Sequence, residues 1–213
     1  MSAAQGTPEW LLERCGFLTA SVFADVMSEA KSGETAGRKN LRAKLVAERM
    51  TGAAQESFSS SAMQWGNECE PLARAAYEMA SDLLVDEVGF VKHPSIEWAG
   101  ASPDGLVSDS GLVEIKCPNT ATHIEYLIER KPPKKYLLQM QWQMACTGRQ
   151  WCDFVSFDPR MPEAHQMMCV RIERDAVLIG SMEKAALVFL AEVGETIERL
   201  NGLANNQTPL KAA

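Results

Sequence analysis

Two short motifs bring together three residue types that can cleave a phosphodiester. Ser102-Pro103-Asp104-Gly105 is followed, nine residues after its glycine, by Glu114-Ile115-Lys116. Cleavage needs one or two hard divalent cations, and Mg²⁺ prefers carboxylate, carbonyl and water oxygens. Asp104 and Glu114 can supply carboxylates, while Lys116 can hold the attacking water and screen the charge that develops on the phosphate. The motifs therefore predict metal-dependent phosphodiester hydrolysis.

The second motif has the pattern of a β-strand. In residues 111–117 the apolar Val113 and Ile115 alternate with the charged Glu114 and Lys116. A period of two is typical of a strand with one buried face. Glu114 and Lys116 are therefore expected to point to the same side of the strand, as a shared site requires.

A turn separates the two motifs. Asp109-Ser110-Gly111 is turn-like, so the chain is predicted to fold into a hairpin that brings Asp104 beside Glu114. The backbone carbonyl of Ile115 then becomes a further candidate metal ligand. The same pattern also fits a surface hairpin whose charged residues are solvated and whose first motif serves only as a turn.

Apolar periodicity and capping residues predict the elements that would position these motifs. Helices are predicted over residues 7–15, 19–30, 38–50, 63–81, 122–130, 134–146 and 175–200. Strands are predicted over residues 83–92, 97–101, 106–108, 112–117, 151–157 and 166–172. A loop is predicted over residues 51–61. The order predicts an α/β or α+β sandwich in which helices flank a central mixed sheet.

Composition sets the size and class of the protein. The chain has 213 residues, of which 46% are hydrophobic, which is enough for one sizeable core. We expect a single domain over residues 1–200 and a C-terminal tail over residues 201–213. The formal net charge of −7 argues against a general nucleic-acid coat protein, because phosphate contacts need Lys or Arg. It does not exclude a nuclease, because bound cations offset the carboxylates of such a site.

Other site classes lack a signal. No stretch reaches the roughly 20 apolar residues of a membrane span, and residues 1–5 do not resemble a signal peptide, so a cytoplasmic protein without a membrane partner is expected. The six cysteines include no Cys-x-x-Cys pair, and His93, His123 and His165 lack paired ligand spacing. Neither zinc nor an iron–sulfur cluster is predicted. The cysteines are expected to be reduced and mostly packed.

Two basic clusters are candidate DNA tracks. The first contains Arg38, Lys39, Arg42 and Lys44, and the second contains Arg130, Lys131, Lys134 and Lys135. A confined positive track on an otherwise acidic surface would guide DNA. Either cluster also fits a solvated face, which is the usual role of clustered charges.

Several ordered blocks together resemble one known family. Besides Trp10 they are residues 14–21 (RCGFLTAS), 64–70 (QWGNECE), 101–106 (ASPDGL), 114–118 (EIKCP), 136–141 (YLLQMQ) and 157–161 (FDPRM). In type and order they resemble the exonuclease of phage lambda and the YqaJ-type viral recombinases, which belong to the PD-(D/E)xK nuclease group. The resemblance covers most of the chain and implies a restriction-endonuclease-like core.

The resemblance also implies an activity. It implies a 5′-to-3′ exonuclease of double-stranded DNA that uses two Mg²⁺ ions, with Mn²⁺ as a substitute, and releases 5′-mononucleotides. The 3′ single-stranded overhang would serve homologous recombination through a single-strand annealing recombinase. A homotrimeric ring around DNA ends is implied in the same way.

Catalytic roles follow from the resemblance residue by residue. It assigns the catalytic group to Asp104, Glu114, Lys116 and Glu70. Asp104, Glu114 and the carbonyl of Ile115 would hold metal, and Lys116 would assist the attacking water. Glu70 would complete the acidic cluster from its helix, although spacing alone leaves Glu68 an equal candidate.

The resemblance further implies a pocket for a 5′-phosphate. Its residues would be Arg14, Ser21, Ser102 and Gln139. Arg14 offers a bidentate fork for a terminal phosphate, and Ser21 adds a hydroxyl near a helix N-terminus. Alternatives stay open for three of them. Arg14 also fits an ion pair with Glu9 or Glu13, and Ser21 also fits a helix cap. Gln139 also fits an exposed helical residue.

Two other functions also remain open at this point. Catalytic residues determine the chemistry but not the substrate, so an endonuclease or a single-strand DNA nuclease on the same core is an alternative. A non-catalytic DNA-end-binding recombination scaffold is the alternative from a different class. The presence of Asp104, Glu114 and Lys116 weighs against the scaffold.

Overall fold

The computed structural model describes residues 2–30, 32–55 and 61–205. Its main sheet has five strands, in the spatial order β2 (Val85–Asp86), β5 (Gly105–Val107), β6 (Gly111–Lys116), β7 (Trp151–Phe157) and β8 (Met167–Glu173). β6 and β7 are parallel, and the other neighbours are antiparallel. The predicted mixed sheet is therefore confirmed.

A second, smaller sheet lies beside the N-terminal part of the chain. Its strands are β1 (Leu18–Thr19), β4 (Ala99–Ala101) and β3 (Val91–Lys92). The predicted strand over residues 83–92 is in fact two short strands, β2 and β3, that belong to different sheets. The stretch between them turns the chain from one sheet to the other, which an apolar pattern alone does not reveal.

The N-terminal helices are shorter than predicted. They are α1 (Pro8–Glu13), the 3₁₀ turn η1 (Ala20–Val22) and α2 (Phe23–Val26). The predicted helix over residues 19–30 is wrong at both ends. Thr19 is extended and pairs with Gly100 in the small sheet, and Ser28 donates its hydroxyl to the Asp25 carbonyl. Such local side-chain bonds compete with helix propagation.

The longer helices match their predictions more closely. They are α3 (Ala36–Thr51), α4 (Ser61–Ser81), α5 (Thr120–Glu129), α6 (Lys134–Thr147) and α7 (Ala176–Asn205), with a 3₁₀ turn η2 (Glu163–His165) before β8. α7 continues to Asn205 rather than ending at residue 200, so the first part of the predicted tail is helical. Residues 206–213, and residues 56–60 of the predicted loop, lie outside the described residues.

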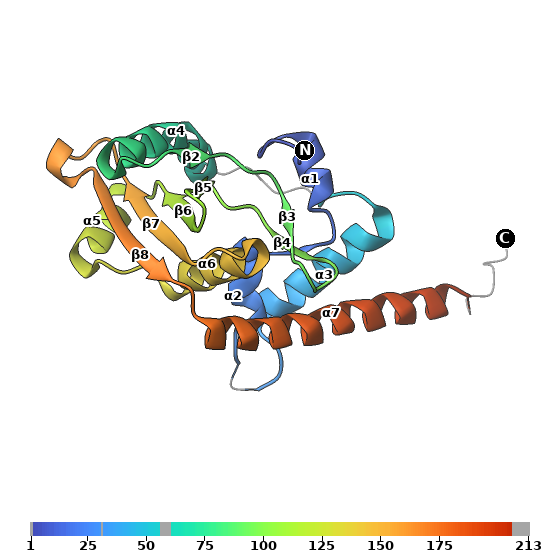
Figure 1. Cartoon of the computed structure of the whole chain (residues 1–213). Helices are drawn as coiled ribbons and strands as arrows, with labels where there is room; N and C mark the ends of the chain where they lie inside the picture. The colour runs from blue at the N-terminus through green and yellow to red at the C-terminus, as the bar shows by residue number, and fades with distance from the viewer. Residues whose placement is uncertain (1, 31, 56–60, 206–213) are drawn as a thin grey trace.

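Helices cover both faces of the main sheet (Figure 1). Leu112 packs into the larger core with α6 and α7, whereas Val113 and Ile115 pack against Tyr77 of α4. The expectation of one buried face on this strand is therefore wrong. α6 covers the other face, the one that carries Glu114, so the charged residues of β6 lie inside the protein.

No helix within the described ranges combines the length and the apolar character of a membrane span. The six cysteines are free thiols, as predicted, and Cys69, Cys146 and Cys152 are buried. Burial raises the pKa of Cys169 to about 12. Thiols held in the protonated form are poor nucleophiles, so these residues serve packing.

A buried aspartate fixes the end of β7. The fully buried Asp158 accepts hydrogen bonds from Arg160 Nε at 2.7 Å and from Thr120 Oγ1 at 2.6 Å. These bonds, led by the one from Arg160, hold the pKa of Asp158 at about 2. A carboxylate pKa below its unfolded value stabilises the fold above that value and loses the effect as the pH falls.

We therefore expect Asp158→Asn to lower the free energy of unfolding by on the order of 1 kcal/mol near neutral pH. The difference between wild type and variant should shrink as the pH falls through the window from about 4 to about 2, because Asp158 becomes protonated there. Urea unfolding at several pH values measures this difference. A difference that stays constant down to about pH 3 would contradict the assignment.

Candidate active site

The two catalytic motifs meet in the hairpin of β5 and β6. Gly105 pairs with Val113, and Asp104 Oδ2 accepts a hydrogen bond from the Ile115 backbone N–H at 2.7 Å. The predicted hairpin is thus confirmed. Because the N–H and C=O of one strand residue point to the same side, the Ile115 carbonyl also faces the side on which Asp104 lies.

Glu114 is fully buried and held by three donors. Its Oε1 accepts from Gln139 Nε2, and its Oε2 accepts from Gln143 Nε2, each at 2.6 Å. Lys116 forms an ion pair with Oε1. Glu114 and Lys116 therefore point to the same side of β6, as the alternation predicted, and the carboxylate has one fixed orientation.

The electrostatics of this cluster show a surplus of carboxylates. Burial and the nearby charge of Asp104 raise the pKa of Glu114 to about 7. Burial alone would lower the pKa of Lys116, but the charges of Glu114 and Asp104 outweigh it and raise that pKa above its ordinary value. Lys116 Nζ lies 4.0 Å from Asp104 Oδ2. One ammonium thus faces two carboxylates.

A third acidic residue, Glu70, reaches the same place from α4. Glu70 lines a cleft together with Asp104, whereas Glu68 is exposed and does not. Arg74, one helical turn later, donates from Nη2 to Glu70 Oε1 at 3.0 Å. Burial and the charge of Asp104 raise the pKa of Glu70. The structure thus places Glu70, rather than Glu68, in the acidic cluster.

The donor set fits a hard divalent cation. Within the described residues, no group of three His, Cys, Asp or Glu side chains is already arranged around one point, and Glu114 is bound by Lys116 and two glutamines. The carboxylates of Asp104 and Glu114 and the Ile115 carbonyl are nevertheless the oxygen donors that Mg²⁺ prefers. Their excess negative charge is what such a cation would offset.

The four residues expected to bind a 5′-phosphate line one pocket of about 160 Å³, which they share with Gln5, Trp10, Ala20 and Asp104. They come from the residue that follows α1, from η1, from the loop before β5 and from α6. The structure therefore brings Arg14, Ser21, Ser102 and Gln139 together beside the candidate catalytic carboxylate of Asp104.

Arg14 provides this pocket with a largely desolvated positive charge. Its guanidinium carbon lies 3.9 Å from the centre of the Trp10 ring, its Nε is buried without a hydrogen-bond partner, and burial lowers its pKa to about 10. Within the described residues it makes no ion pair with Glu9 or Glu13; Glu13 instead binds Ser2. A desolvated guanidinium without a carboxylate is suited to bind an anion.

The other pocket residues differ from the expectations in detail. Ser102 Oγ accepts from Trp10 Nε1 at 3.0 Å, which leaves its own proton for another acceptor. Ser21 lies in a 3₁₀ turn of three residues, so the expected contribution of a helix dipole is absent, and its hydroxyl is 3.5 Å from Thr19 Oγ1. Gln139 is 9% exposed and is not the solvent-facing residue of the alternative interpretation.

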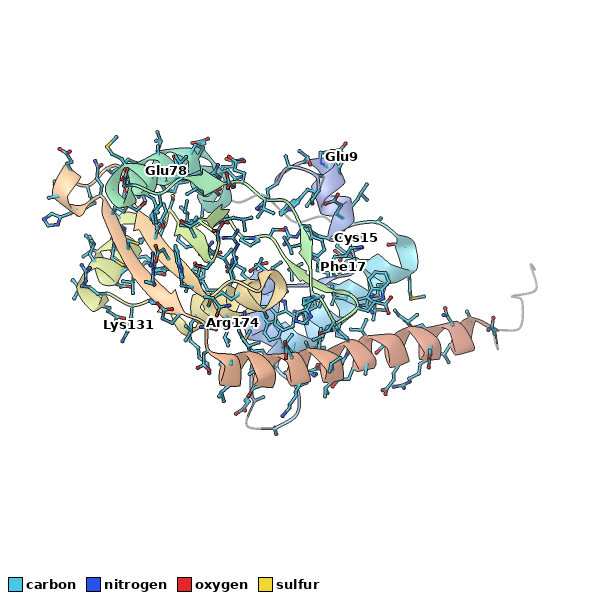
Figure 2. All side chains as sticks on the ribbon, in the orientation of Figure 1. Glu9, Cys15, Phe17, Glu78, Lys131 and Arg174 are labelled. Atoms are coloured by element: carbon cyan, nitrogen blue, oxygen red, sulfur yellow. The ribbon has the colours of Figure 1, made fainter. Side chains whose placement is uncertain are left out.

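The two basic clusters that were candidate DNA tracks differ in their surroundings. Arg38 and Arg42 pair with Glu34 and Glu192, so the first cluster is a local ion-pair network that joins α3 to α7. In the second cluster, Lys131 lies just beyond α5 (Figure 2). It pairs with Glu129, the last residue of that helix, at 3.5 Å.

The remaining part of the second cluster reaches the active site. Lys135 and Tyr136 line a cleft of about 590 Å³ together with Glu70, Lys116 and Gln139. Lys135 Nζ lies 4.6 Å from the centre of the Tyr136 ring. A cation and an aromatic ring at the mouth of an acidic site are suited to a nucleic-acid strand.

Sequence reasoning missed four residues of the site: Gln5, Arg74, Gln143 and, in its pocket role, Trp10. Gln143 had a usable signal, because it follows Gln139 by one helical turn on α6 and must share its face. Arg74 has the same relation to Glu70 on α4. Gln5 meets Pro103, and Trp10 meets Ser102, across long sequence separations, so these contacts had no local signal.

Gln143 is expected to hold the Glu114 carboxylate in the orientation that binds metal. Gln143→Met keeps the side-chain volume but removes the donor, so the dissociation constant for Mg²⁺ or Mn²⁺ should rise about tenfold. Gln141→Met is the matched control, because Gln141 is equally buried on α6 but donates to the Glu173 carbonyl. Calorimetric metal titration distinguishes them, and equal shifts in both variants would contradict the role.

Comparison with known proteins agrees with this geometry. The model of the YqaJ-like viral recombinase domain matches residues 9–150, which include both candidate catalytic motifs and the four candidate phosphate-binding residues. The chain belongs to the YqaJ-like viral recombinase family. No curated protein is significantly similar to it in sequence.

Solved structures of similar proteins show the same fold. An alkaline exonuclease (LHK-Exo) from Laribacter hongkongensis is 51% identical, with a TM-score of 0.88 over 93% of this chain and 98% of that one. The same relative in complex with dAMP is 52% identical over the same shares, also at 0.88. A phage related exonuclease from Haemophilus somnus 129PT is 18% identical, with a TM-score of 0.71 over 86% of this chain and 96% of that one, which supports the fold alone.

Proposed function

We propose that this chain is a Mg²⁺-dependent 5′-to-3′ exonuclease of double-stranded DNA that leaves 3′ single-stranded overhangs and releases 5′-mononucleotides. The observation that carries the proposal is the pocket of about 160 Å³ in which the four candidate phosphate-binding residues and Asp104 form common walls. A terminal phosphate bound there would place the first internucleotide bond next to the acidic cluster. Cleavage of that bond releases one nucleotide.

The charge in the pocket supports a terminal phosphate as ligand. A terminal phosphate carries about one more negative charge than an internal phosphodiester at neutral pH, and Arg14 is a desolvated cation whose Nε has no hydrogen-bond partner and on which the charge of Glu48 has a smaller effect than burial. The hydroxyl of Ser102 retains its proton for a further acceptor. The relative that is 51% identical is an alkaline exonuclease and is also known in complex with dAMP.

The acidic cluster is suited to hydrolysis of the bond. Two Mg²⁺ ions, or Mn²⁺ in their place, neutralise the phosphate, activate water and stabilise the leaving oxygen when bound. Asp104, Glu114 and the Ile115 carbonyl would hold them, with Glu70 as an additional carboxylate. Lys116 stays protonated because its pKa is raised, so its ammonium would position the water and screen charge on the phosphate.

The substrate and partners follow from the same proposal. DNA would enter along Lys135 and Tyr136, which lie at the cleft that contains Lys116. The 3′ overhang would be the substrate of a single-strand annealing recombinase, and a homotrimeric ring would keep the enzyme on its DNA. The recombinase partner and the homotrimer are both proposed from the family resemblance.

Digestion of three DNAs in Mg²⁺ tests the proposal: a linear duplex with 5′-phosphates, the same duplex with 5′-hydroxyls, and a closed circle. The phosphorylated duplex should be digested from its 5′ ends while the circle stays intact, and a chelator should stop the reaction. Cutting of the circle would favour an endonuclease. End binding without digestion would favour the non-catalytic scaffold.

A further inference from the structure

The segment of residues 2–6 lies across the end of the active-site cleft. Ser2 donates its hydroxyl to Glu13 Oε2 at 2.6 Å and accepts the Phe90 backbone N–H at 2.8 Å. The Ala3 N–H donates to Glu13 Oε1 at 3.2 Å. The segment is thus anchored both to α1 and to the chain just before β3.

Close packing at Gly89 fits the segment to this place. A Cβ atom at Gly89 would collide with the Ala3 backbone carbonyl and with the Ser2 side chain. Glycine has no Cβ and therefore allows this approach. Any larger residue at position 89 would push residues 2–6 away from residue 89, because the Ala3 carbonyl cannot move without the rest of its backbone.

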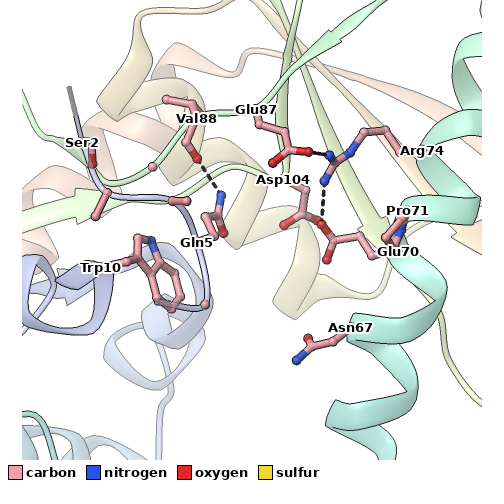
Figure 3. A pocket seen from close by; sticks show the side chains of 14 residues that line it. Ser2, Gln5, Trp10, Asn67, Glu70, Pro71, Arg74, Glu87, Val88 and Asp104 are labelled. Atoms are coloured by element: carbon pink, nitrogen blue, oxygen red, sulfur yellow. Dashed lines mark hydrogen bonds and ion pairs between the residues drawn. The ribbon is translucent and has the colours of Figure 1, made fainter. Parts of the chain in front are cut away.

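Gln5 ties the same segment to the catalytic loop. Its Nε2 donates to the Pro103 carbonyl at 2.7 Å and to the Val88 carbonyl at 2.8 Å. Pro103 directly precedes Asp104, which Figure 3 shows beside Glu70 and near Gln5. Both hydrogens of the amide are used, so Gln5 bridges two backbone segments and has one fixed orientation.

Gln5 also lines two cavities. Gln5, Trp10 and Asp104 line both the phosphate pocket of about 160 Å³ and a larger cavity of about 620 Å³. These three residues therefore lie where the two cavities adjoin. The larger cavity is the cleft that contains Glu70, and it is bounded further by residues 2–6, by Arg74 of α4 and by residues 87–89 (Figure 3).

We propose that Gln5 and residues 2–6 form a strand stop, a wall that ends the DNA path at the terminal phosphate. This inference rests on the proposed exonuclease function. The phosphate pocket of about 160 Å³ is much smaller than the adjoining cavity of about 620 Å³, which suits a phosphate rather than a further nucleotide. A strand that continues beyond its first phosphate would meet Gln5. The strand stop restricts cleavage to chain ends that are free.

The consequence is selection against blocked ends. A duplex whose 5′-phosphate carries a bulky group, such as fluorescein on a linker, cannot seat that phosphate while the wall is intact. Without the wall, the blocking group could enter the 620 Å³ cavity beyond. Removing the wall should therefore increase the use of blocked ends relative to free ones.

The test compares the digestion of fluorescein-blocked and 5′-phosphorylated duplexes in Mg²⁺. Gln5→Ala removes both hydrogen bonds that hold this wall in place, so the ratio of blocked to free rates should rise about tenfold or more. Gln166→Ala is the matched control, because Gln166 Nε2 also bridges two backbone carbonyls, those of Pro159 and Met161, at a place far from the cleft. Its ratio should equal that of wild type.

A second variant and a binding measurement cover the case in which Gln5→Ala also disturbs Asp104. Gly89→Ala should displace residues 2–6 by steric collision while keeping the Gln5 side chain, and it should raise the same ratio. In an Asp104→Asn background, competition for binding between blocked and free duplexes should shift toward the blocked one in both variants. If both variants kept the wild-type ratio of blocked to free duplex, in digestion and in binding, the strand stop would be wrong. If the wild-type protein failed to digest free ends, the proposed exonuclease function would be wrong instead.

Discussion

Asp104→Asn should abolish Mg²⁺-dependent digestion of DNA while leaving the fold intact. Loss of a shared metal ligand removes several kcal/mol of transition-state stabilisation, which corresponds to a rate loss on the order of a thousandfold or more. The asparagine is nearly isosteric, and its side-chain oxygen can still accept the Ile115 N–H that Asp104 binds at 2.7 Å. Activity should therefore be lost without loss of structure.

Thermal unfolding and a digestion assay on the same sample measure both parts of this result. Asp109→Asn is the matched control, because Asp109 is an exposed carboxylate in the turn of the same hairpin. The control should keep wild-type activity. If Asp104→Asn retained Mg²⁺-dependent digestion, the assignment of the hairpin to the catalytic site would be wrong, whether or not the variant bound DNA normally.

Arg14→Ala should remove the preference for phosphorylated ends. A charge-assisted hydrogen bond contributes about 1.5–3 kcal/mol, so digestion of a 5′-phosphorylated duplex should fall about 10- to 100-fold. Digestion of the 5′-hydroxyl duplex should fall much less, because that end lacks the group that Arg14 binds. Arg14→Lys should recover only part of the loss, since an ammonium cannot offer a bidentate fork.

Arg49→Ala is the matched control for this experiment. Arg49 is also desolvated and lies 4.5 Å from the centre of the Trp98 ring, but it donates to the Gly16 carbonyl and does not line the phosphate pocket. Its removal should affect both DNA ends equally. An equal loss on both ends after Arg14→Ala would instead assign Arg14 a structural role.

Sequence patterns located the parts of this site that depend on local geometry. The alternation in β6 placed Glu114 and Lys116 on one side, and the turn placed Asp104 beside them, because hairpins and strands obey short-range rules. The strand Trp151–Phe157 was predicted with both of its ends. The resemblance to a family, rather than any spacing, selected Glu70 over Glu68.

Tertiary contacts account for what the sequence did not predict. Thr19 is drawn into a strand by its pairing with Gly100, which overrides the helical pattern of the following residues. Arg38 and Arg42 looked like a DNA track, but their partner Glu192 lies 154 and 150 residues away along the chain. Gln5 meets Pro103 across 98 residues. Local periodicity contains no information about such pairs.

The most direct test of the central claim is strand-resolved digestion of a linear duplex in which one 5′-phosphorylated strand carries a different label near each end. In Mg²⁺, the label in the 5′-terminal nucleotide should be released first, as a 5′-mononucleotide, while the 3′ label stays on a strand that shortens with time. Release of the 3′ label first, or internal fragments that retain the 5′ label, would contradict a 5′-to-3′ exonuclease.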